Sequence, residues 1–233
     1  MLHKLSVLIP VYNERATIER LLTQVVSVDT GLQLEVLVGD DGSSDGTREI
    51  LSKLKLPGVT VIFMPENVGR GGVIKQLWMR ATGDVYVHQD ADLEYDPRDY
   101  IPLLQPLLNG TADVVYGSRF KGSIEKMRWL NRMGNLTMSA AARALYGVQV
   151  SDLMTCYKMY CAELVRGLQI RANGFDFEAE FTARLAQRGA RFAEAPISFT
   201  GRTFEEGKKI NAFDAVRVMR ELLRCKLPGG ARG

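Results

Sequence analysis

Cysteine and histidine are scarce in this chain of 233 residues. Its three cysteines, Cys156, Cys161 and Cys225, form an odd and sparse set, which argues against a disulfide framework and for a reducing compartment. Its two histidines, His3 and His88, lie far apart in the sequence, which argues against a zinc site. The chain is long enough to be stabilised by an ordinary hydrophobic core alone.

Long apolar runs and a strong excess of one charge are also missing. No segment reaches the roughly 18 to 20 apolar residues that cross a bilayer, and the N-terminus enters a short apolar segment without a signal-peptide pattern. The net charge of +3 is too mild to indicate nucleic-acid binding. With 46% hydrophobic and 24% charged residues, the chain is expected to be a cytoplasmic globular protein.

Strand-like and helix-like patterns alternate along the first half of the chain. This alternation predicts right-handed βαβ crossovers and an α/β fold with a mainly parallel, twisted sheet flanked by helices. The expected strands are residues 5–11, 35–38, 59–64, 84–88 and 112–116, and the expected helices are residues 14–26, 44–54, 71–81 and one that Pro97 opens.

The second half is less regular, and no break in composition separates it from the first. We therefore predict one domain over residues 1–224 with two lobes, 1–118 and 119–224, and a flexible tail over 225–233. The expected elements are helices over 127–146, 177–188 and 213–224, a short strand over 157–161, and a strand over 191–200 that Pro196 interrupts.

The most informative segment is residues 85–94, where a short apolar run ends in the acidic side chains of Asp90, Asp92 and Glu94. Carboxylates at the carboxyl end of a parallel strand face the crevice where ligands bind. Asp90 and Asp92 are two residues apart on extended chain and can share one cation. Mg²⁺ or Mn²⁺ is usually held by one or two carboxylates and substrate phosphates. The segment predicts a metal–diphosphate site, and the alternative is a polar turn after an edge strand.

Two further polar clusters follow strands, at residues 10–14 and 40–43, and parallel strands bring such clusters to one edge of a sheet. Tyr12 can stack on a base, and Asp40 or Asp41 can accept hydrogen bonds from a base or a ribose. The alternatives are a tyrosine that covers the core and a turn that caps a helix.

Two glycine-containing segments give weaker evidence about function. Residues 69–72 precede a helix and can let the backbone approach a phosphate, but tight helix packing explains them equally well. Residues 42–46 match the nucleophile elbow of serine hydrolases, yet the only histidine downstream, His88, lies within a strand, which disfavours that class.

The motifs at residues 9–14, 40–47 and 89–93 resemble, in order, those of family-2 glycosyltransferases with the GT-A fold. Residues 117–120, 152–158, 174–178, 196–199 and 207–209 resemble the dolichol- or polyprenol-phosphate mannosyl- and glucosyltransferases, so the resemblance covers nearly the whole chain. It implies a nucleotide-binding lobe over 1–118 and an acceptor-binding lobe over 119–224. It places Pro10, Tyr12, Glu14, Asp40 and Asp41 on the nucleoside, Asp90, Ala91 and Asp92 on the metal and diphosphate, and Glu94, a glutamine in relatives, as a third metal ligand.

The nature of the acceptor decides which other groups the reaction needs. A lipid phosphate is already anionic and needs cations, for which the resemblance offers Arg119, Arg202, Lys208 and Lys209. Without the resemblance, residues 201–209 would be a solvated loop of alternating charge. An alcohol acceptor needs a general base, Asp176 or Glu178, although carboxylates at a helix start also serve as caps.

Basic residues alternate with large apolar ones in residues 127–136 and 213–224. Such helices can lie in a bilayer interface, or they can simply pack an apolar stripe on the core.

The sequence as a whole thus resembles a glycosyltransferase that uses Mg²⁺ or Mn²⁺. The resemblance implies inverting transfer of a hexose from a GDP-mannose-type or UDP-glucose-type donor to polyprenyl phosphate at the inner membrane face. The alternatives are a soluble family-2 enzyme with an alcohol acceptor and a non-catalytic nucleotide-sugar-binding module. A nucleotidyltransferase is disfavoured, because it would carry a glycine-rich basic loop where residues 12–14 stand.

Overall fold

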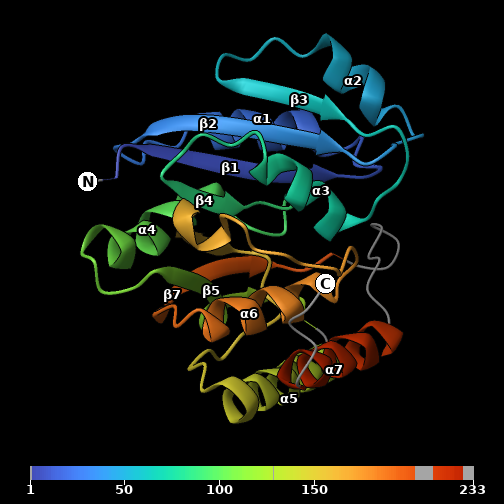
Figure 1. The fold of residues 1–233 in the computed structure, drawn as a ribbon. Coiled ribbons are helices and arrows are strands. Elements are labelled where there is room, and N and C mark those ends of the chain that lie inside the picture. Colours follow the sequence, from blue (N-terminus) through green and yellow to red (C-terminus); the bar gives the residue numbers. More distant parts are fainter. Residues whose placement is uncertain (1, 128, 203–211, 228–233) are drawn as a thin grey trace.

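One seven-stranded sheet forms the centre of the molecule in the computed structural model, which describes residues 2–127, 129–202 and 212–227 (Figure 1). The strand order is β3-β2-β1-β4-β6-β5-β7. β6 runs antiparallel to both of its neighbours, and every other pair is parallel, which confirms the predicted mainly parallel sheet. The strands are β1 (Lys4–Val11), β2 (Gln33–Asp40), β3 (Val59–Phe63), β4 (Val85–His88), β5 (Val114–Glu125), β6 (Lys158–Cys161) and β7 (Phe192–Thr200).

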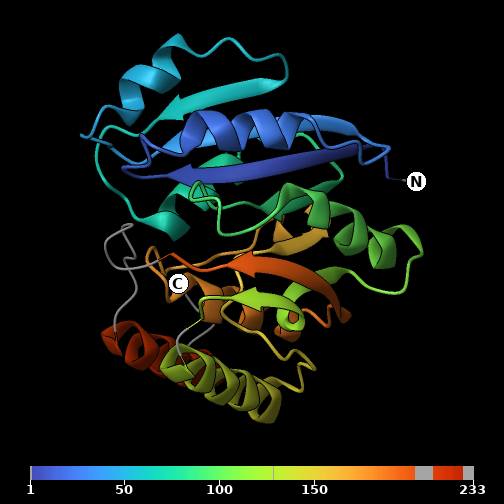
Figure 2. The same ribbon diagram turned by 180° about the vertical axis from the view of Figure 1, so that it is seen from behind.

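Helices cover both faces of the sheet, as Figures 1 and 2 show from opposite sides. α1, α2 and α4 contribute to the core on one face, and α3, α5, α6 and α7 to the core on the other. The helices are α1 (Ile18–Val26), α2 (Thr47–Lys53), α3 (Arg70–Trp78), α4 (Tyr100–Leu108), α5 (Trp129–Tyr146), α6 (Phe177–Gln187) and α7 (Ala212–Lys226), with short 3₁₀ turns at Pro97–Asp99 and Ala162–Val165. None of these described helices is long and apolar enough to span a bilayer.

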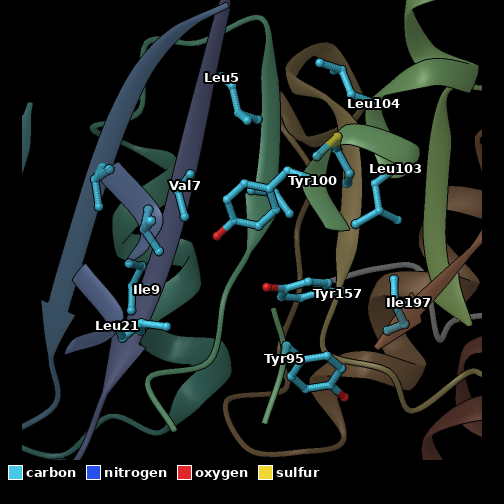
Figure 3. Packing of buried hydrophobic residues seen from close by; sticks show 14 of the residues in the cluster. Leu5, Val7, Ile9, Leu21, Tyr95, Tyr100, Leu103, Leu104, Tyr157 and Ile197 are labelled. Carbon is cyan, nitrogen blue, oxygen red and sulfur yellow. The ribbon is translucent and has the colours of Figure 1, made fainter. Parts of the chain in front are cut away.

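Successive side chains of a β-strand point to opposite faces of the sheet, so β1 contributes side chains to both hydrophobic cores. Leu5, Val7 and Ile9 point into the core beside α1 and α4, where Figure 3 shows them facing Tyr100. Leu8 points to the opposite face and joins the second core. Because β1 is buried on both faces, its sequence is almost entirely apolar from Leu5 to Val11, with Ser6 as the one polar residue, as is typical of a central parallel strand.

β5 is longer than expected, and β7 has nearly the expected bounds. β5 continues to Glu125 because residues 123–125 pair again with β7 after a register shift. At Gly122 a Cβ would lie 2.0 Å from the Ile197 carbonyl oxygen, so a glycine is required there. β7 runs through Pro196 without a break, because it is an edge strand and tolerates a residue without an N–H, but its register with β5 shifts directly after this residue.

The C-terminal helix is also longer than expected. α7 runs to Lys226, so Cys225 and Lys226 belong to the helix and not to the predicted tail. Cys225 is 2% exposed and packs against the rest of the protein. The three cysteines are free thiols.

Candidate active site

The edge of the sheet at which β1, β2 and β4 end gathers the three polar segments that the sequence predicts to converge. The Asn13 amide donates to the Ser43 hydroxyl (2.9 Å), and the Asn13 side-chain oxygen accepts from the Ser44 amide (2.9 Å). The Thr17 hydroxyl donates to the carbonyl of Ala91 (2.8 Å) and so joins the segment before α1 to the segment after β4. The predicted convergence is confirmed, and we call this edge the carboxyl edge.

Asp90 is held by Arg70, the first residue of α3. Nε and Nη2 of Arg70 each lie 3.2 Å from Oδ1 of Asp90, and Nη1 is paired with Glu178. Glu178 forms a second ion pair, with Lys158, which is completely buried. Asp90 is therefore the outer end of a row of alternating charges, Lys158–Glu178–Arg70–Asp90, which we call the charge row.

Asp92 is held by Arg202, which follows β7. Nη2 of Arg202 lies 2.7 Å from Oδ2 of Asp92, and the same guanidinium donates to both oxygens of Glu14 at 3.0 and 3.2 Å. The backbone amide of Arg202 donates to Oε1 of Glu94 (2.7 Å). Arg202 thus connects the segments after β1, β4 and β7.

The carboxyl group of Asp92 carries a strongly perturbed pKa. Burial raises it, the charges of Asp90 and Glu94 raise it further, and the charge of Arg202 offsets part of the effect, so that the pKa lies at about 7. Burial, with the two neighbouring negative charges, thus makes the carboxyl group of Asp92 a weaker acid than an ordinary aspartic acid.

The local backbone differs from the extended chain on which the shared-cation argument was based. β4 ends at His88, so Asp90 and Asp92 lie in a turn beyond the strand. Leu93 has φ of +61°, a left-handed conformation that is uncommon for leucine. This turn lets the Glu94 amide donate to Oδ1 of Asp92 (3.2 Å).

The donor set fits a hard divalent cation. In the described chain, Asp90, Asp92 and Glu94 do not bring one ligand atom each within 4.8 Å of one another, so the predicted set of three metal ligands is not assembled in this structure. Arg70 is paired with Asp90, and Arg202 with Asp92. Mg²⁺ or Mn²⁺ needs only one or two carboxylates when phosphate oxygens complete its shell. Burial and the charges of Asp90 and Glu94 raise the pKa of Asp92, and a divalent ion bound there would offset both effects.

The predicted nucleoside residues divide into accessible and internally paired ones. Tyr12 is 39% exposed, so it does not cover the core, and Pro10 lies near the end of β1. Asp40 is fully buried and accepts from Nε of Arg48 (2.8 Å). Asp41 accepts from the amides of Val68 (2.7 Å) and Gly69 (3.0 Å), and burial raises its pKa. Asp40 thus anchors the start of α2, and Asp41 anchors the loop before α3.

Arg119 lies at the same edge of the sheet, in β5. Its Nε and Nη2 bind the two oxygens of Asp152 at 2.7 and 2.8 Å, and its guanidinium lies 5.0 Å from the ring centroid of Phe199. Burial alone would raise the pKa of Asp152, but the charge and hydrogen bonds of Arg119 lower it below its usual value. Arg119 is therefore a permanent, rigidly held cation.

The two candidate bases differ in their surroundings. Glu178, 2% exposed, is paired through both oxygens, with Arg70 and Lys158. Asp176 lies at the N-cap position of α6 but makes no side-chain capping hydrogen bond, so the expected capping role is not found. Lys208 and Lys209 lie outside the described residues.

The glycine-rich segment at the start of α3 serves helix packing. A Cβ on Gly71 would lie 2.7 Å from Cβ of Phe177, and the Gly71 amide donates to the Asn173 carbonyl (2.7 Å). The hydrolase alternative also fails, because His88 is fully buried and its Nε2 is hydrogen-bonded to the Tyr160 hydroxyl (2.7 Å).

Sequence reasoning missed Arg70 and Lys158. Arg70 stands between glycines at a helix start, and Lys158 ends the polyprenol-type motif at residues 152–158. A charged residue between glycines is the signal that identifies Arg70, whereas the motif of Lys158 contains other polar residues and gives no such signal. Their partner Glu178 is distant in sequence, so only the fold reveals the pairing.

Comparison with known proteins places this geometry in a family context. Residues 6–168 match the profile of glycosyl transferase family 2. The dolichyl-phosphate hexose transferase of Haloferax volcanii is 34% identical over 201 residues, which are 86% of this chain and 85% of that protein. The dolichol-phosphate mannosyltransferase of Pyrococcus furiosus is 30% identical over 211 residues, 88% of this chain but only 59% of that protein.

A solved structure shares the fold. The glucosyl-3-phosphoglycerate synthase of Mycobacterium tuberculosis, crystallised with Mn²⁺, uridine diphosphate and phosphoglyceric acid, superposes with a TM-score of 0.73. The superposition covers 97% of this chain and 80% of that one, at 24% sequence identity.

Proposed function

This chain belongs to glycosyl transferase family 2 and is a glycosyltransferase; we propose that it transfers a hexose from a nucleoside-diphosphate sugar to a polyprenyl phosphate. The observation that carries the proposal is the guanidinium of Arg202 beside Asp92 (2.7 Å). The guanidinium is a cation that could bind an anionic acceptor, and it lies next to the carboxylates that we expect to hold the donor diphosphate through a metal ion. The names of the relatives, a dolichyl-phosphate hexose transferase among them, support a lipid phosphate as acceptor.

On the donor side, Tyr12 is accessible for stacking on the base, and Asp90 and Asp92 would hold Mg²⁺ or Mn²⁺, with Glu94 as a third ligand. When bound, the ion supplies Lewis-acid stabilisation to the departing nucleoside diphosphate. Support comes from the structural neighbour that was crystallised with Mn²⁺ and uridine diphosphate. We propose a donor of the GDP-mannose or UDP-glucose type.

On the acceptor side, Arg119 and Arg202 would orient the phosphate. An oxygen of the acceptor phosphate forms a bond to the anomeric carbon while the bond from that carbon to the diphosphate oxygen breaks. The bonding electrons leave with the nucleoside diphosphate, and the configuration inverts. A phosphate oxygen that is already anionic needs no general base, which agrees with the full pairing of Glu178.

An alcohol acceptor is the second candidate, and one observation favours it. Asp176 at the start of α6 lacks the capping hydrogen bond that would give it a structural role. If it were the base, Asp176→Asn would lower kcat about 10²-fold or more. We expect a change below tenfold, with Glu19→Gln, an exposed carboxylate on α1, as the matched control.

A donor and acceptor screen tests the proposal. Purified protein is incubated with a nucleoside-diphosphate hexose, Mg²⁺ or Mn²⁺ and short-chain polyprenyl phosphate, and the released nucleoside diphosphate is identified. We expect turnover that a chelator abolishes. Turnover with a hydroxylated acceptor but with no lipid phosphate would overturn the acceptor assignment, and full activity after chelation would overturn the metal. We place the reaction at the cytoplasmic face of a membrane, which the free thiols support.

A further inference from the structure

The four members of the charge row come from four separate elements and lead from the carboxyl edge into the protein. Asp90 follows β4 and Arg70 begins α3, whereas Glu178 lies in the first turn of α6 and Lys158 begins β6. α3 and α6 contribute to the same hydrophobic core (Figure 1). The exposed fraction of the side chain falls along the row, from 19% for Asp90 at the outer end to zero for Lys158 at the inner end. The row thus connects the expected metal site with a buried ion pair.

Stability alone does not explain a row of buried charges. Removing ions from water is costly, and apolar side chains of similar volume often replace a buried ion pair without loss of stability. The inner end of this row is nevertheless firmly fixed, because Lys158 donates to the carbonyls of Leu153 (3.1 Å) and Thr155 and also pairs with Glu178. Glu178 in turn fixes the guanidinium of Arg70. The row therefore supplies a cation of defined orientation at the expected metal site.

Glu178 determines how the guanidinium of Arg70 meets Asp90. An arginine often binds a carboxylate through two parallel hydrogen bonds, one to each oxygen. Here Nη1 of Arg70 is paired with Glu178, and Nε and Nη2 both donate to the same oxygen of Asp90, Oδ1, at 3.2 Å. The guanidinium therefore does not occupy Oδ2 of Asp90, which leaves that oxygen for a second cation.

Two neighbouring titratable side chains add no charge to the row near pH 7. Burial, and then the two cations of the row, lower the pKa of His88 well below its usual value. Burial, and then the charge of Asp90, raise the pKa of the Cys156 thiol. The three members behind Asp90 are therefore two cations and one carboxylate. Their positive excess opposes the binding of another cation, and Glu178 is the member of the row that limits it.

We propose that Glu178 and Lys158 are positioning residues, which set the affinity of the carboxyl edge for a divalent ion through Arg70. Glu178 compensates the charge of Arg70 and holds its guanidinium on one oxygen of Asp90, so it favours binding of the ion. Lys158 is the second cation of the row, so it opposes binding. This inference rests on the metal ion of the proposed function but not on its acceptor.

Titration of the full chain with Mn²⁺ alone, followed by electron paramagnetic resonance of the free ion, tests the proposal. Glu178→Gln should bind Mn²⁺ about tenfold more weakly and Lys158→Met about tenfold more tightly, whereas the double variant should have nearly the wild-type Kd. A purely structural role would shift both single variants in the same direction. Glu35→Gln is the matched control and should bind like the wild type. It removes a carboxylate that is paired with Lys4 (2.7 Å) near the starts of β1 and β2, at the opposite edge of the sheet.

Two further comparisons keep the test decisive. If Glu178→Gln does not fold, Lys158→Met and the double variant differ by the same carboxylate, and the double variant should bind Mn²⁺ about tenfold more weakly than Lys158→Met. In turnover assays the half-saturating Mn²⁺ concentration should follow the same order, with kcat at saturating Mn²⁺ within about tenfold of the wild type, whereas loss of a base would lower kcat about 10²-fold or more.

The outcomes separate this inference from the proposed function. Equal Kd values for all variants, or shifts of both single variants in the same direction, would overturn the positioning role and leave the proposed function intact. No binding of Mn²⁺ by any variant would overturn the positioning role together with the proposed metal ion. The expected order of Kd values, without turnover on any lipid phosphate, would support the positioning role and overturn only the proposed acceptor.

Discussion

The charge row makes a quantitative prediction for Glu178→Gln. Glu178 is the shared partner of Arg70 and Lys158, and the Lys158 side chain is completely inaccessible to solvent. Replacing the carboxylate by an amide keeps the shape but leaves two buried cations with less compensation. Removing one partner of a buried ion pair costs about 3 to 5 kcal/mol.

The remaining contacts of the two cations place this substitution at the lower end of that range. Lys158 still donates to the carbonyl of Leu153 (3.1 Å) and lies 4.7 Å from the ring centroid of Tyr116. Arg70 keeps Asp90. We therefore expect a loss of about 3 kcal/mol in the free energy of unfolding, which corresponds to a fall in Tm of about 6 to 12 °C for a domain of this size.

Urea denaturation of three variants measures the effect. Lys158→Met should destabilise the fold by a similar amount. The double variant Glu178→Gln/Lys158→Met should recover most of the lost stability, because the opposite charges of Glu178 and Lys158 are then both removed. Glu163→Gln is the matched control: its pair with Arg166 is solvent-exposed and should contribute less than about 1 kcal/mol. A loss below about 1 kcal/mol for Glu178→Gln would refute the structural role. A kcat that falls about 10²-fold or more in the double variant as well would identify Glu178 as a base.

Three further predictions concern other parts of the molecule. Burial alone would raise the pKa of Glu35, but hydrogen bonds from neighbouring side chains and backbone lower it from 4.5 to about 2. The ionised carboxylate therefore stabilises the folded protein fully above pH 4.5, and this contribution is lost as the pH falls toward 2. Glu35→Gln should reduce the acid-dependent loss of unfolding free energy by about 1 kcal/mol in urea titrations. An unchanged acid slope would contradict this. Gly122→Ala should lower the free energy of unfolding by about 2 kcal/mol or more, because its Cβ would meet a carbonyl oxygen of β7 at 2.0 Å. Gly134→Ala, where a Cβ would enter open space, should instead stabilise α5 by about 0.5 to 1 kcal/mol. The reverse order in thermal melts would be inconsistent with the β5–β7 pairing. Arg202→Gln should increase the affinity for Mn²⁺ severalfold in calorimetric titrations without a nucleotide, because it removes the cation paired with Asp92 at 2.7 Å. Weaker binding of Mn²⁺ by this variant would show that Arg202 supports the ion rather than competing with it.

The order of elements and the location of the site could be predicted from the sequence because both depend on local patterns. Apolar runs such as residues 5–11 are typical of buried strands, and in a parallel sheet the polar residues after such strands must converge at one edge. Asp90, Asp92 and Tyr12 were found in this way. The same reasoning misjudged β5 beyond Tyr116, because residues 117–125 are polar and glycine-containing and become a strand only through pairing with β7.

The sequence by itself determined the fold class and the segments that form the site, because hydrophobic periodicity and the ends of strands depend on residues that are close together in the sequence. Only the tertiary structure decided which charges neutralise one another. Glu14 meets Arg202 across 188 positions and Arg70 meets Glu178 across 108. Coulomb interactions depend on distance in space, and no local pattern encodes that distance.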